Sequence, residues 1–205
     1  AMSESAIQFN DGEGYERMMG AWSRLAGDRF LDWLAPPPGL RWVDIGCGNG
    51  AFSELIVQRC QPAEVQGIDP APAQIAYAGS RPGAAGASFQ VGDALALPWP
   101  DGRFDASVMA LVVFFLPDPP AGVREMVRVT RPGGTVCAYA WDLPGGGLPL
   151  EPVNDAFRAL GKTPPLPPHP EVSTLEALAG LWREAGLLDV ETCTITVQRR
   201  FESAE

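Results

Sequence analysis

The sequence predicts an α/β fold, a doubly wound and mainly parallel sheet with flanking helices on both faces. From Arg41 onward, apolar segments of strand length alternate with segments that carry apolar residues at helical spacing. Three alternating glycines, Gly46, Gly48 and Gly50, connect the first of these strands to the first of these helices. An acidic residue, Asp69, ends the second strand about 20 residues later. This order is typical of a Rossmann-like nucleotide-binding sheet.

The N-terminal segment is predicted to be helical. Apolar residues recur at helical spacing between Asp11 and Leu34. Gly27 indicates a break into two helices, and the Pro-Pro-Pro-Gly run at 36–39 ends the segment. We assign residues 1–38 to an N-terminal helical cap, which either packs on the sheet or covers a binding cleft.

Residues 39–141 are interpreted as the binding core. Ligands of open parallel sheets bind outside the carboxyl ends of the strands, and Gly46, Asp69, Asp93 and Met109 all fall at such ends. The expected strands are Arg41–Ile45, Glu64–Asp69, Ala87–Val91, Phe104–Met109 and Thr135–Trp141. The expected helices are Ala51–Arg59, Pro72–Ala78 and Ala121–Val129.

Composition and charge exclude several classes of protein. No run approaches the ~20 apolar residues that span a bilayer, and the N-terminus has no targeting signature. Four scattered cysteines and one histidine argue against a metal site or a disulfide framework. A net charge of −10 without a basic run disfavours nucleic acid. We therefore expect a reduced cytoplasmic protein without membrane, metal or nucleic-acid partners; the oligomeric state is not indicated.

The glycine turn by itself leaves more than one ligand open. The spacing Gly46-x-Gly48-x-x-Ala51 also satisfies the dinucleotide fingerprint, and a strand–turn–helix without any ligand is a further interpretation. Asp44, two residues before the first glycine, separates the candidate cofactors. Its carboxylate would repel a pyrophosphate, whereas it would attract a ligand that carries an ammonium and a sulfonium.

Four ordered segments carry a resemblance to a known family. Val43–Gly50 together with Asp69 resembles the first two signature segments of class I S-adenosylmethionine-dependent methyltransferases. Gly92–Asp105 is similar to the family's Asp-x-x-x-Leu-Pro…Phe-Asp run. Phe115–Asp118 and Arg131–Thr135 are similar to its loop after the fourth strand and its Arg-Pro-Gly-Gly turn. More narrowly, the chain resembles the methyltransferase type 11 group, which includes ubiquinone- and menaquinone-biosynthesis enzymes.

This resemblance implies that the chain binds S-adenosyl-L-methionine and moves its methyl group to a small-molecule acceptor. Asp69 would accept hydrogen bonds from both ribose hydroxyls, and Asp93 would accept one from the adenine amino group. Backbone at Met109 would meet the methionyl ammonium, and Arg24 could meet the methionyl carboxylate. The residues expected to bind the cofactor are Asp44, Gly46, Cys47, Gly48, Asp69, Pro70, Asp93, Ala94, Met109, Tyr15, Met19, Trp22 and Arg24.

The resemblance also divides the last third of the chain. Residues 142–172, rich in glycine and proline around a short helix at Val153–Leu160, are expected to form a substrate-lid insertion. Residues 173–205 are expected to supply the last helix and an alternating strand at 188–201. Folds of this class close with one more antiparallel strand, which we expect to be missing from this chain. The whole of 1–205 is interpreted as one domain.

The catalytic residues are not identified by the sequence. No base is obligatory if the acceptor is already an enolate, a thiolate or a free amine. For a hydroxyl or phenol, His169, Tyr139 and Asp142 are the nearest candidates. Two alternative functions stay open, an NAD(P)-dependent reductase and a non-catalytic S-adenosylmethionine-binding protein.

Overall fold

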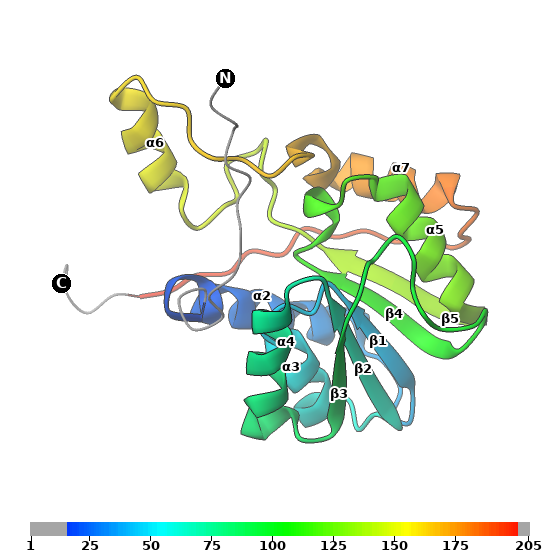
Figure 1. Cartoon of the computed structure of the whole chain (residues 1–205). Helices are drawn as coiled ribbons and strands as arrows, with labels where there is room; N and C mark the ends of the chain where they lie inside the picture. The colour runs from blue at the N-terminus through cyan, green and yellow to red at the C-terminus, as the bar shows by residue number, and fades with distance from the viewer. Residues whose placement is uncertain (1–15, 201–205) are drawn as a thin grey trace.

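A computed structural model describes residues 16–200, and its centre is a five-stranded parallel sheet (Figure 1). The strand order is β3-β2-β1-β4-β5. The direction of winding reverses between β1 and β4, so the carboxyl ends of these two strands flank the position where open sheets bind ligands. The predicted fold class is confirmed. The strands are β1 (Arg41–Ile45), β2 (Glu64–Asp69), β3 (Ala87–Val91), β4 (Phe104–Ala110) and β5 (Thr130–Tyr139).

Helices cover both faces of the sheet (Figure 1). On one face, α3 contacts β2, α4 contacts β3, and α2 packs on α3; on the other, α5 contacts β4 and β5 and is joined by α7. The helices are α2 (Ala21–Leu34), α3 (Ala51–Arg59), α4 (Pro72–Ser80), α5 (Pro119–Val129), α6 (Glu151–Ala159) and α7 (Leu175–Glu184). Short helical turns complete the chain: η1 (Glu16–Gly20), η2 (Pro82–Ala84), η3 (Val113–Phe115) and η4 (Pro170–Ser173).

The core consists of two apolar layers, one on each side of the sheet. Phe30 of α2 and Leu55 and Ile56 of α3 cover one face, and all three are buried. Phe104 of β4 and Met126 of α5 lie in the other layer. Each such side chain contributes about 1.5–3 kcal/mol when it is removed from water, so these layers hold the strand ends in place.

Two predicted boundaries move because of local chemistry. Helix α5 begins two residues earlier than expected, because Pro119 and Pro120 occupy the first turn and Asp118 accepts a hydrogen bond from the Ala121 N–H at 2.9 Å. Strand β5 begins at Thr130, five residues before the predicted start. The Arg-Pro-Gly-Gly turn lies inside this strand as an irregularity, since the register with β4 shifts there.

The predicted helix break at Gly27 is wrong. Helix α2 runs without interruption from Ala21 to Leu34, and Gly27 is buried within it. A methyl group built on Gly27 would lie 2.8 Å from Leu55 Cδ1 and 3.1 Å from the Tyr139 hydroxyl. The glycine therefore permits a close approach between α2 and its neighbours, which outweighs its low helix propensity.

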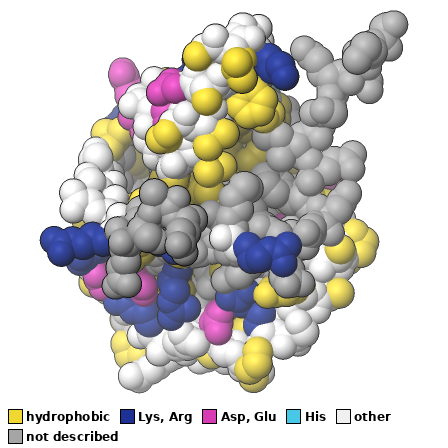
Figure 2. All heavy atoms as spheres, turned by 90° about the vertical axis from the view of Figure 1, so that its left-hand side faces the viewer, with side chains coloured by type: hydrophobic (Ala, Val, Ile, Leu, Met, Phe, Trp, Pro, Cys, Tyr) yellow, Lys and Arg dark blue, Asp and Glu magenta, His cyan; other side chains and the backbone are white. Residues whose placement is uncertain are grey.

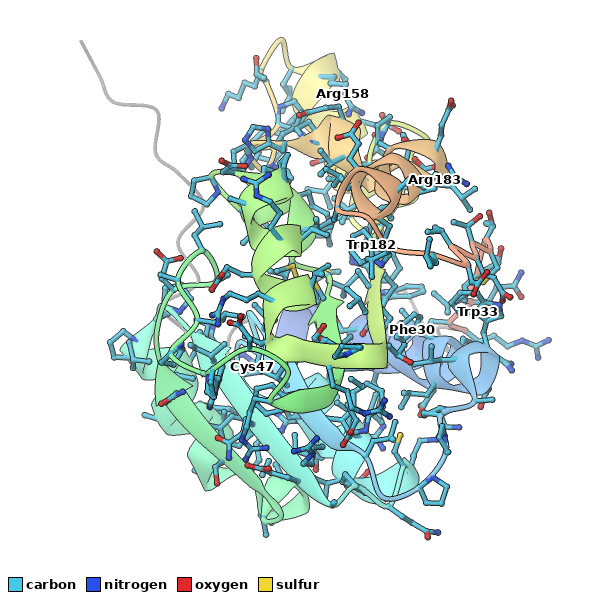
Figure 3. The ribbon with its side chains drawn as sticks, turned by 90° about the vertical axis from the view of Figure 1, so that its right-hand side faces the viewer. Phe30, Trp33, Cys47, Arg158, Trp182 and Arg183 are labelled. Atoms are coloured by element: carbon cyan, nitrogen blue, oxygen red, sulfur yellow. The ribbon has the colours of Figure 1, made fainter. Side chains whose placement is uncertain are left out.

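The predicted strand at 188–201 is also wrong over its described part, since residues 187–200 form no strand. An extended segment becomes a strand only when its peptide groups have a partner, and within 16–200 the outer edge of β5 pairs with no strand. A groove of about 1,230 Å³ separates β5 from residues 186–197. Figure 3 shows Trp182 of α7 on one side of the groove and Phe30 and Trp33 of α2 on the other. Trp182 Nε1 donates to the carbonyl oxygen of Val136 in β5 at 2.7 Å.

A charged cluster at the amino ends of the strands gives a first prediction. The Asp105 carboxylate accepts from the Arg41 backbone and Nε, both at 2.9 Å, and from Arg131 Nε at 2.6 Å. The Arg41 hydrogen bonds, assisted by Arg131, hold the pKa of Asp105 well below its usual range. Because this pKa is depressed by folding, the carboxylate stabilises the fold above its unfolded pKa of about 3.9, and that contribution is lost as the pH falls.

We therefore expect Asp105→Asn to lower the free energy of unfolding by about 1–3 kcal/mol at pH 7. Denaturant titrations at several pH values measure this difference, which should shrink as the pH approaches 3. The control is Asp101→Asn, because Asp101 is 83% exposed and its ion pair with Arg128 is worth at most about 1 kcal/mol. Equal losses for the two variants would contradict the assignment.

Candidate functional site

The glycine turn after β1 has a packed side and an open side. Gly46 and Gly48 have φ angles of +73° and +51°, which other residues adopt only with strain. The N–H groups of Gly46 and Cys47 donate to the Ile68 carbonyl at 2.8 and 3.0 Å, which fastens the turn to β2. A methyl group built on Gly46 would lie 2.5 Å from Val112 Cγ1, whereas one built on Gly48 would meet nothing within 4 Å. A ligand can therefore approach the backbone at Gly48.

Asp69 joins the tip of β2 to this turn. Its Oδ2 accepts from the Gly48 N–H and its Oδ1 from the Ala71 N–H, both at 2.9 Å. Burial raises the pKa of Asp69, and the two backbone hydrogen bonds oppose that rise. A carboxylate offers about four acceptor positions, so two remain for a ligand. Pro70 follows at the exposed start of the turn into α4.

Asp44 is buried inside the sheet. Its side chain is 0% exposed, and its Oδ2 accepts from Ser53 Oγ of α3 at 2.7 Å. Its Oδ1 is also buried and has no hydrogen-bond partner among the described residues. Burial raises the pKa of Asp44 to about 7, with the charge of Asp69 acting in the same direction and Ser53 against it. Burial, followed by the charges of Asp44 and Asp69, raises the pKa of the neighbouring Cys47, so this thiol stays neutral.

Asp93 and Ala94 lie just after β3. Asp93 is exposed, and its Oδ1 accepts from the Leu95 N–H at 2.9 Å, so it caps the turn that follows the strand. Ala94 is 9% exposed and packs in the core layer with Ile68. The capping bond uses one carboxylate oxygen, and the other can accept a hydrogen bond from a ligand, so capping and ligand binding are compatible here.

The carboxyl end of β4 contains a feature that the sequence does not reveal. Met109 is fully buried, and two residues later Leu111 has a φ of +62°, which is an outlier for a bulky residue. The Leu111 N–H donates to the Tyr139 carbonyl at 2.9 Å. This turn brings Val112 against Gly46, and Val112 thus closes the space between the ends of β1 and β4. No sequence pattern signals a left-handed leucine.

The N-terminal candidates are dispersed. Tyr15 lies outside the described residues. Met19 in η1 is 4% exposed, and Trp22 lines the groove beside β5. Arg24 Nη2 donates to Gln58 Oε1, in the last turn of α3, at 3.2 Å. The expected contact of Arg24 with a cofactor carboxylate stays a prediction.

The three candidate bases are held by other parts of the protein. The Tyr139 ring lies 4.8 Å from that of Phe30 and 5.4 Å from that of Phe52, so it packs between α2 and α3. Asp142 Oδ1 accepts from the Gly145 N–H at 3.0 Å and stabilises a turn. His169 lies 3.0 Å from Glu171 Oε1 and 3.3 Å from the Pro117 carbonyl, and it fastens residues 142–172 to the loop after β4.

Helix α6 projects from the body of the molecule (Figure 1). Val153 is 51% exposed, Phe157 37% and Leu160 74%, and all three lie on one side of the helix. Figure 2 shows the hydrophobic side chains gathered on this projecting part. Asn154, on another side, is buried and donates to Glu151 at 3.2 Å. An apolar helix face is thus available near the residues that follow β5.

Two further observations limit the chemistry of the described part of the chain. Between residues 16 and 200, no group of three or more His, Cys, Asp or Glu side chains is placed to hold a metal ion. No helix in that range has both the length and the apolar character needed to cross a membrane. All four cysteines are free, and Cys47, Cys60 and Cys137 are buried.

Known proteins resemble this chain in sequence. Residues 43–138 match the family described as "Methyltransferase domain", type 11. The malonyl-[acyl-carrier protein] O-methyltransferase of Serratia marcescens is 34% identical over 131 residues, which are 64% of this chain and 50% of that protein. The demethylmenaquinone methyltransferase of Deinococcus radiodurans is 36% identical over 129 residues, 62% of this chain and 52% of that protein. The chain thus spans about half the length of these relatives.

Solved structures share the fold. A S-adenosylmethionine-dependent methyltransferase of Aquifex aeolicus has a TM-score of 0.64 at 17% identity, over 86% of this chain and 88% of that one. A possible histamine N-methyltransferase of Thermotoga maritima has a TM-score of 0.59 at 23% identity, over 84% and 76%. At 17% and 23% identity, these two structures support the fold alone. Residues 43–138 are therefore similar in sequence to the methyltransferase domain family.

Proposed function

We propose that this chain is a S-adenosylmethionine-dependent methyltransferase that acts on a small-molecule acceptor. The observation that carries the proposal is an open glycine turn that follows a strand with a buried carboxyl, one of whose oxygens has no hydrogen-bond partner among the described residues. Gly48 leaves room for a ligand beside the backbone, and Asp44 Oδ1 has no hydrogen-bond partner among the described residues. A buried acceptor of this kind calls for a donor or a cation.

The residues present fit this cofactor better than a dinucleotide. S-adenosylmethionine carries an ammonium and a sulfonium, which suit the carboxyls of Asp44 and Asp69. The pyrophosphate of a nicotinamide cofactor would add negative charge beside them. In the part of the chain that the structure describes, no arginine or lysine pairs with either carboxyl, so that charge would not be offset.

Within this proposal, each strand end has a role. Asp69 accepts from the ribose hydroxyls with its two remaining acceptor positions, while Gly46, Cys47 and Gly48 supply backbone beside the methionyl part. Pro70 flanks the ribose, the second oxygen of Asp93 accepts from the adenine amino group, and the Ala94 N–H donates to a ring nitrogen. The backbone at Met109 meets the ammonium. Met19, Trp22 and Arg24 are proposed to contact the cofactor from the N-terminal helical segment, and Tyr15, which lies outside the described residues, is proposed with them from the sequence.

When bound, the cofactor supplies a methyl group on a positively charged sulfur. The protein holds the acceptor in line with that methyl and excludes water, and such placement accounts for about 7–11 kcal/mol of a barrier. Val112 and Phe115, after β4, are positioned to exclude water. Because Tyr139 and Asp142 are engaged elsewhere, we propose an acceptor that needs no proton removed by either of them.

The acceptor is proposed to be partly apolar. Its support is the apolar face of α6, with Val153, Phe157 and Leu160, which lies within the proposed lid at residues 142–172. The two relatives named above act on a malonyl-carrier protein and on a demethylmenaquinone, so their names agree on methyl transfer and differ in the acceptor. We further propose that the chain is one domain and that it lies in the cytoplasm, because its thiols are free. A net charge of −10 disfavours a nucleic-acid partner.

Calorimetry and a transfer assay test this function. S-adenosylhomocysteine, the demethylated product, should bind, and NADH should not. Methyl-labelled cofactor should then pass label to a small-molecule extract. Binding of NADH without binding of S-adenosylhomocysteine would favour a reductase, and tight binding without any transfer would favour a non-catalytic cofactor-binding protein.

The role of Asp69 gives a prediction within this function. Asp69→Ala should weaken S-adenosylhomocysteine binding by about 1.5–3 kcal/mol, which is the range for hydrogen bonds to a charged group. Calorimetry measures the change, and thermal unfolding shows whether the variant is folded. Asp118→Ala is the matched control, because Asp118 also accepts a backbone N–H, as the N-cap of α5, and has no proposed contact with the cofactor. Unchanged affinity for Asp69→Ala would remove this residue from the site.

A further inference from the structure

The pair of Asp44 and Ser53 has a property that simple cofactor contact does not require. Both side chains are completely buried, and Ser53 Oγ donates to Asp44 Oδ2 at 2.7 Å. The other oxygen, Oδ1, is buried without a partner. The neutral donor groups of Ser53 offset only part of the free energy lost when a carboxylate leaves water.

The groups that face Asp44 from the surrounding elements provide no positive charge. Asp69 on β2 carries a negative charge when ionised, and it disfavours ionisation of Asp44. The thiols of Cys47 in the glycine turn and Cys137 on β5 sense the charge of Asp44, and burial raises the pKa of both, so they stay neutral. Among residues 16–200, no arginine or lysine forms a hydrogen bond or ion pair with Asp44. Without a ligand, the carboxyl therefore retains its proton.

A ligand that carries an ammonium changes this balance. An opposite charge close to a buried carboxyl favours its ionised form, because Coulomb attraction is strong where water is excluded. We propose that Asp44 exchanges its proton for the cationic methionyl group of the cofactor, with Ser53 as the positioning residue that holds the carboxyl for this exchange. The inference rests on the proposed function, and it adds the release of one proton to the binding reaction.

The exchange has a defined stoichiometry. The protonated carboxyl loses one proton to the buffer as the ammonium of the ligand arrives, and no covalent bond to carbon or sulfur changes. Affinity should rise up to about tenfold per pH unit while Asp44 is protonated in the free protein, and it should become constant near pH 7, where burial places the Asp44 pKa. Above that pH, no proton is released.

Ser53 influences the pH at which the affinity for the ligand becomes constant. Its hydroxyl donates to the ionised carboxylate and therefore favours ionisation. Removal of the hydroxyl in Ser53→Ala should move the pH at which affinity becomes constant to a higher value. A serine with a merely structural role would instead weaken binding equally at every pH.

The test is calorimetry of S-adenosylhomocysteine binding from pH 5.5 to 8.5, in two buffers that differ in ionisation enthalpy. The wild-type protein should release close to one proton per ligand at pH 5.5 and almost none at pH 8.5. Asp44→Asn should release none, and its remaining affinity should not vary with pH. A second ligand, 5′-methylthioadenosine, has the nucleoside without the ammonium and should release no proton from the wild-type protein.

The matched control is Ser107→Ala. Ser107 is also fully buried, on the neighbouring strand β4, but its hydroxyl contacts Thr130 and the Met126 carbonyl. This variant should keep the wild-type pH profile. Binding without proton release at any pH would overturn the inference and leave the cofactor assignment intact, as would release that persists in Asp44→Asn. Absence of any binding would instead contradict the proposed function.

Discussion

Gly48→Val is expected to leave the chain folded and to reduce the affinity for S-adenosylhomocysteine by at least about 100-fold, or roughly 2.7 kcal/mol. A side chain at this position would fill the space that is now open, since nothing lies within 4 Å of a methyl group built there. The positive φ of +51° adds about 1–2 kcal/mol of backbone strain, which a folded domain can absorb. Calorimetry measures the affinity and thermal unfolding measures the stability.

Gly46→Ala is the matched variant, and its main effect should be on stability. The added methyl would lie 2.5 Å from Val112 Cγ1, so both steric overlap and backbone strain act, and we expect a loss of about 2–5 kcal/mol. Combining it with Val112→Ala should recover part of that loss. If Gly48→Val bound the ligand as tightly as the wild type, the cofactor would lie elsewhere and the proposed site would be wrong.

Asp44→Asn is expected to become more stable relative to the wild type as the pH rises from 4 to 8. Folding raises the pKa of Asp44 from 3.8 to about 7, so the folded protein binds this proton more tightly than the unfolded chain. The free energy of unfolding of the wild type is therefore greatest, as far as this carboxyl is concerned, below pH 4, and it declines as the pH rises to about 7. Three pKa units correspond to roughly 4 kcal/mol, and the asparagine avoids that decline.

The measurement compares the free energies of unfolding of the two proteins at each pH, without ligand, so that the other carboxylates cancel. Asp105→Asn serves as the control because its pKa shift has the opposite sign: its difference from the wild type should stay nearly constant from pH 5 to 8 and shrink only as the pH falls below about 4. Parallel curves for Asp44→Asn and the wild type would show that Asp44 is ionised without a ligand, which contradicts the buried proton.

The sheet was largely predictable from the sequence because local patterns of residues indicate each strand. Strands β1, β2 and β3 have the predicted bounds, since a glycine follows β1 and β3 directly and an acidic residue ends β2. The position of Asp69 beside the glycine turn also follows from spacing, since parallel strands bring their carboxyl ends to one edge. These patterns depend only on residues that are close together in the sequence.

Other features depend on residues that are distant in sequence. Gly27 indicates a break by local propensity, but Leu55 and Tyr139 require a small residue there and the helix continues. The segment at 188–200 alternates like a strand, but β5 lies across a groove and cannot pair with it. The hydrogen bond from Arg24 of α2 to Gln58 of α3 likewise joins residues that are distant in sequence.

The sequence by itself determined the order of strands and helices, the glycine turn, and the acidic residues at the strand ends, because periodicity and glycine chemistry act over short distances. Only the tertiary structure decided which oxygen of Asp44 is held by Ser53 and which is left without a partner. It also decided that Leu111 adopts a left-handed conformation that sets Val112 against Gly46. Burial and hydrogen-bond partnership arise when distant segments pack together, and no single stretch of the chain encodes them.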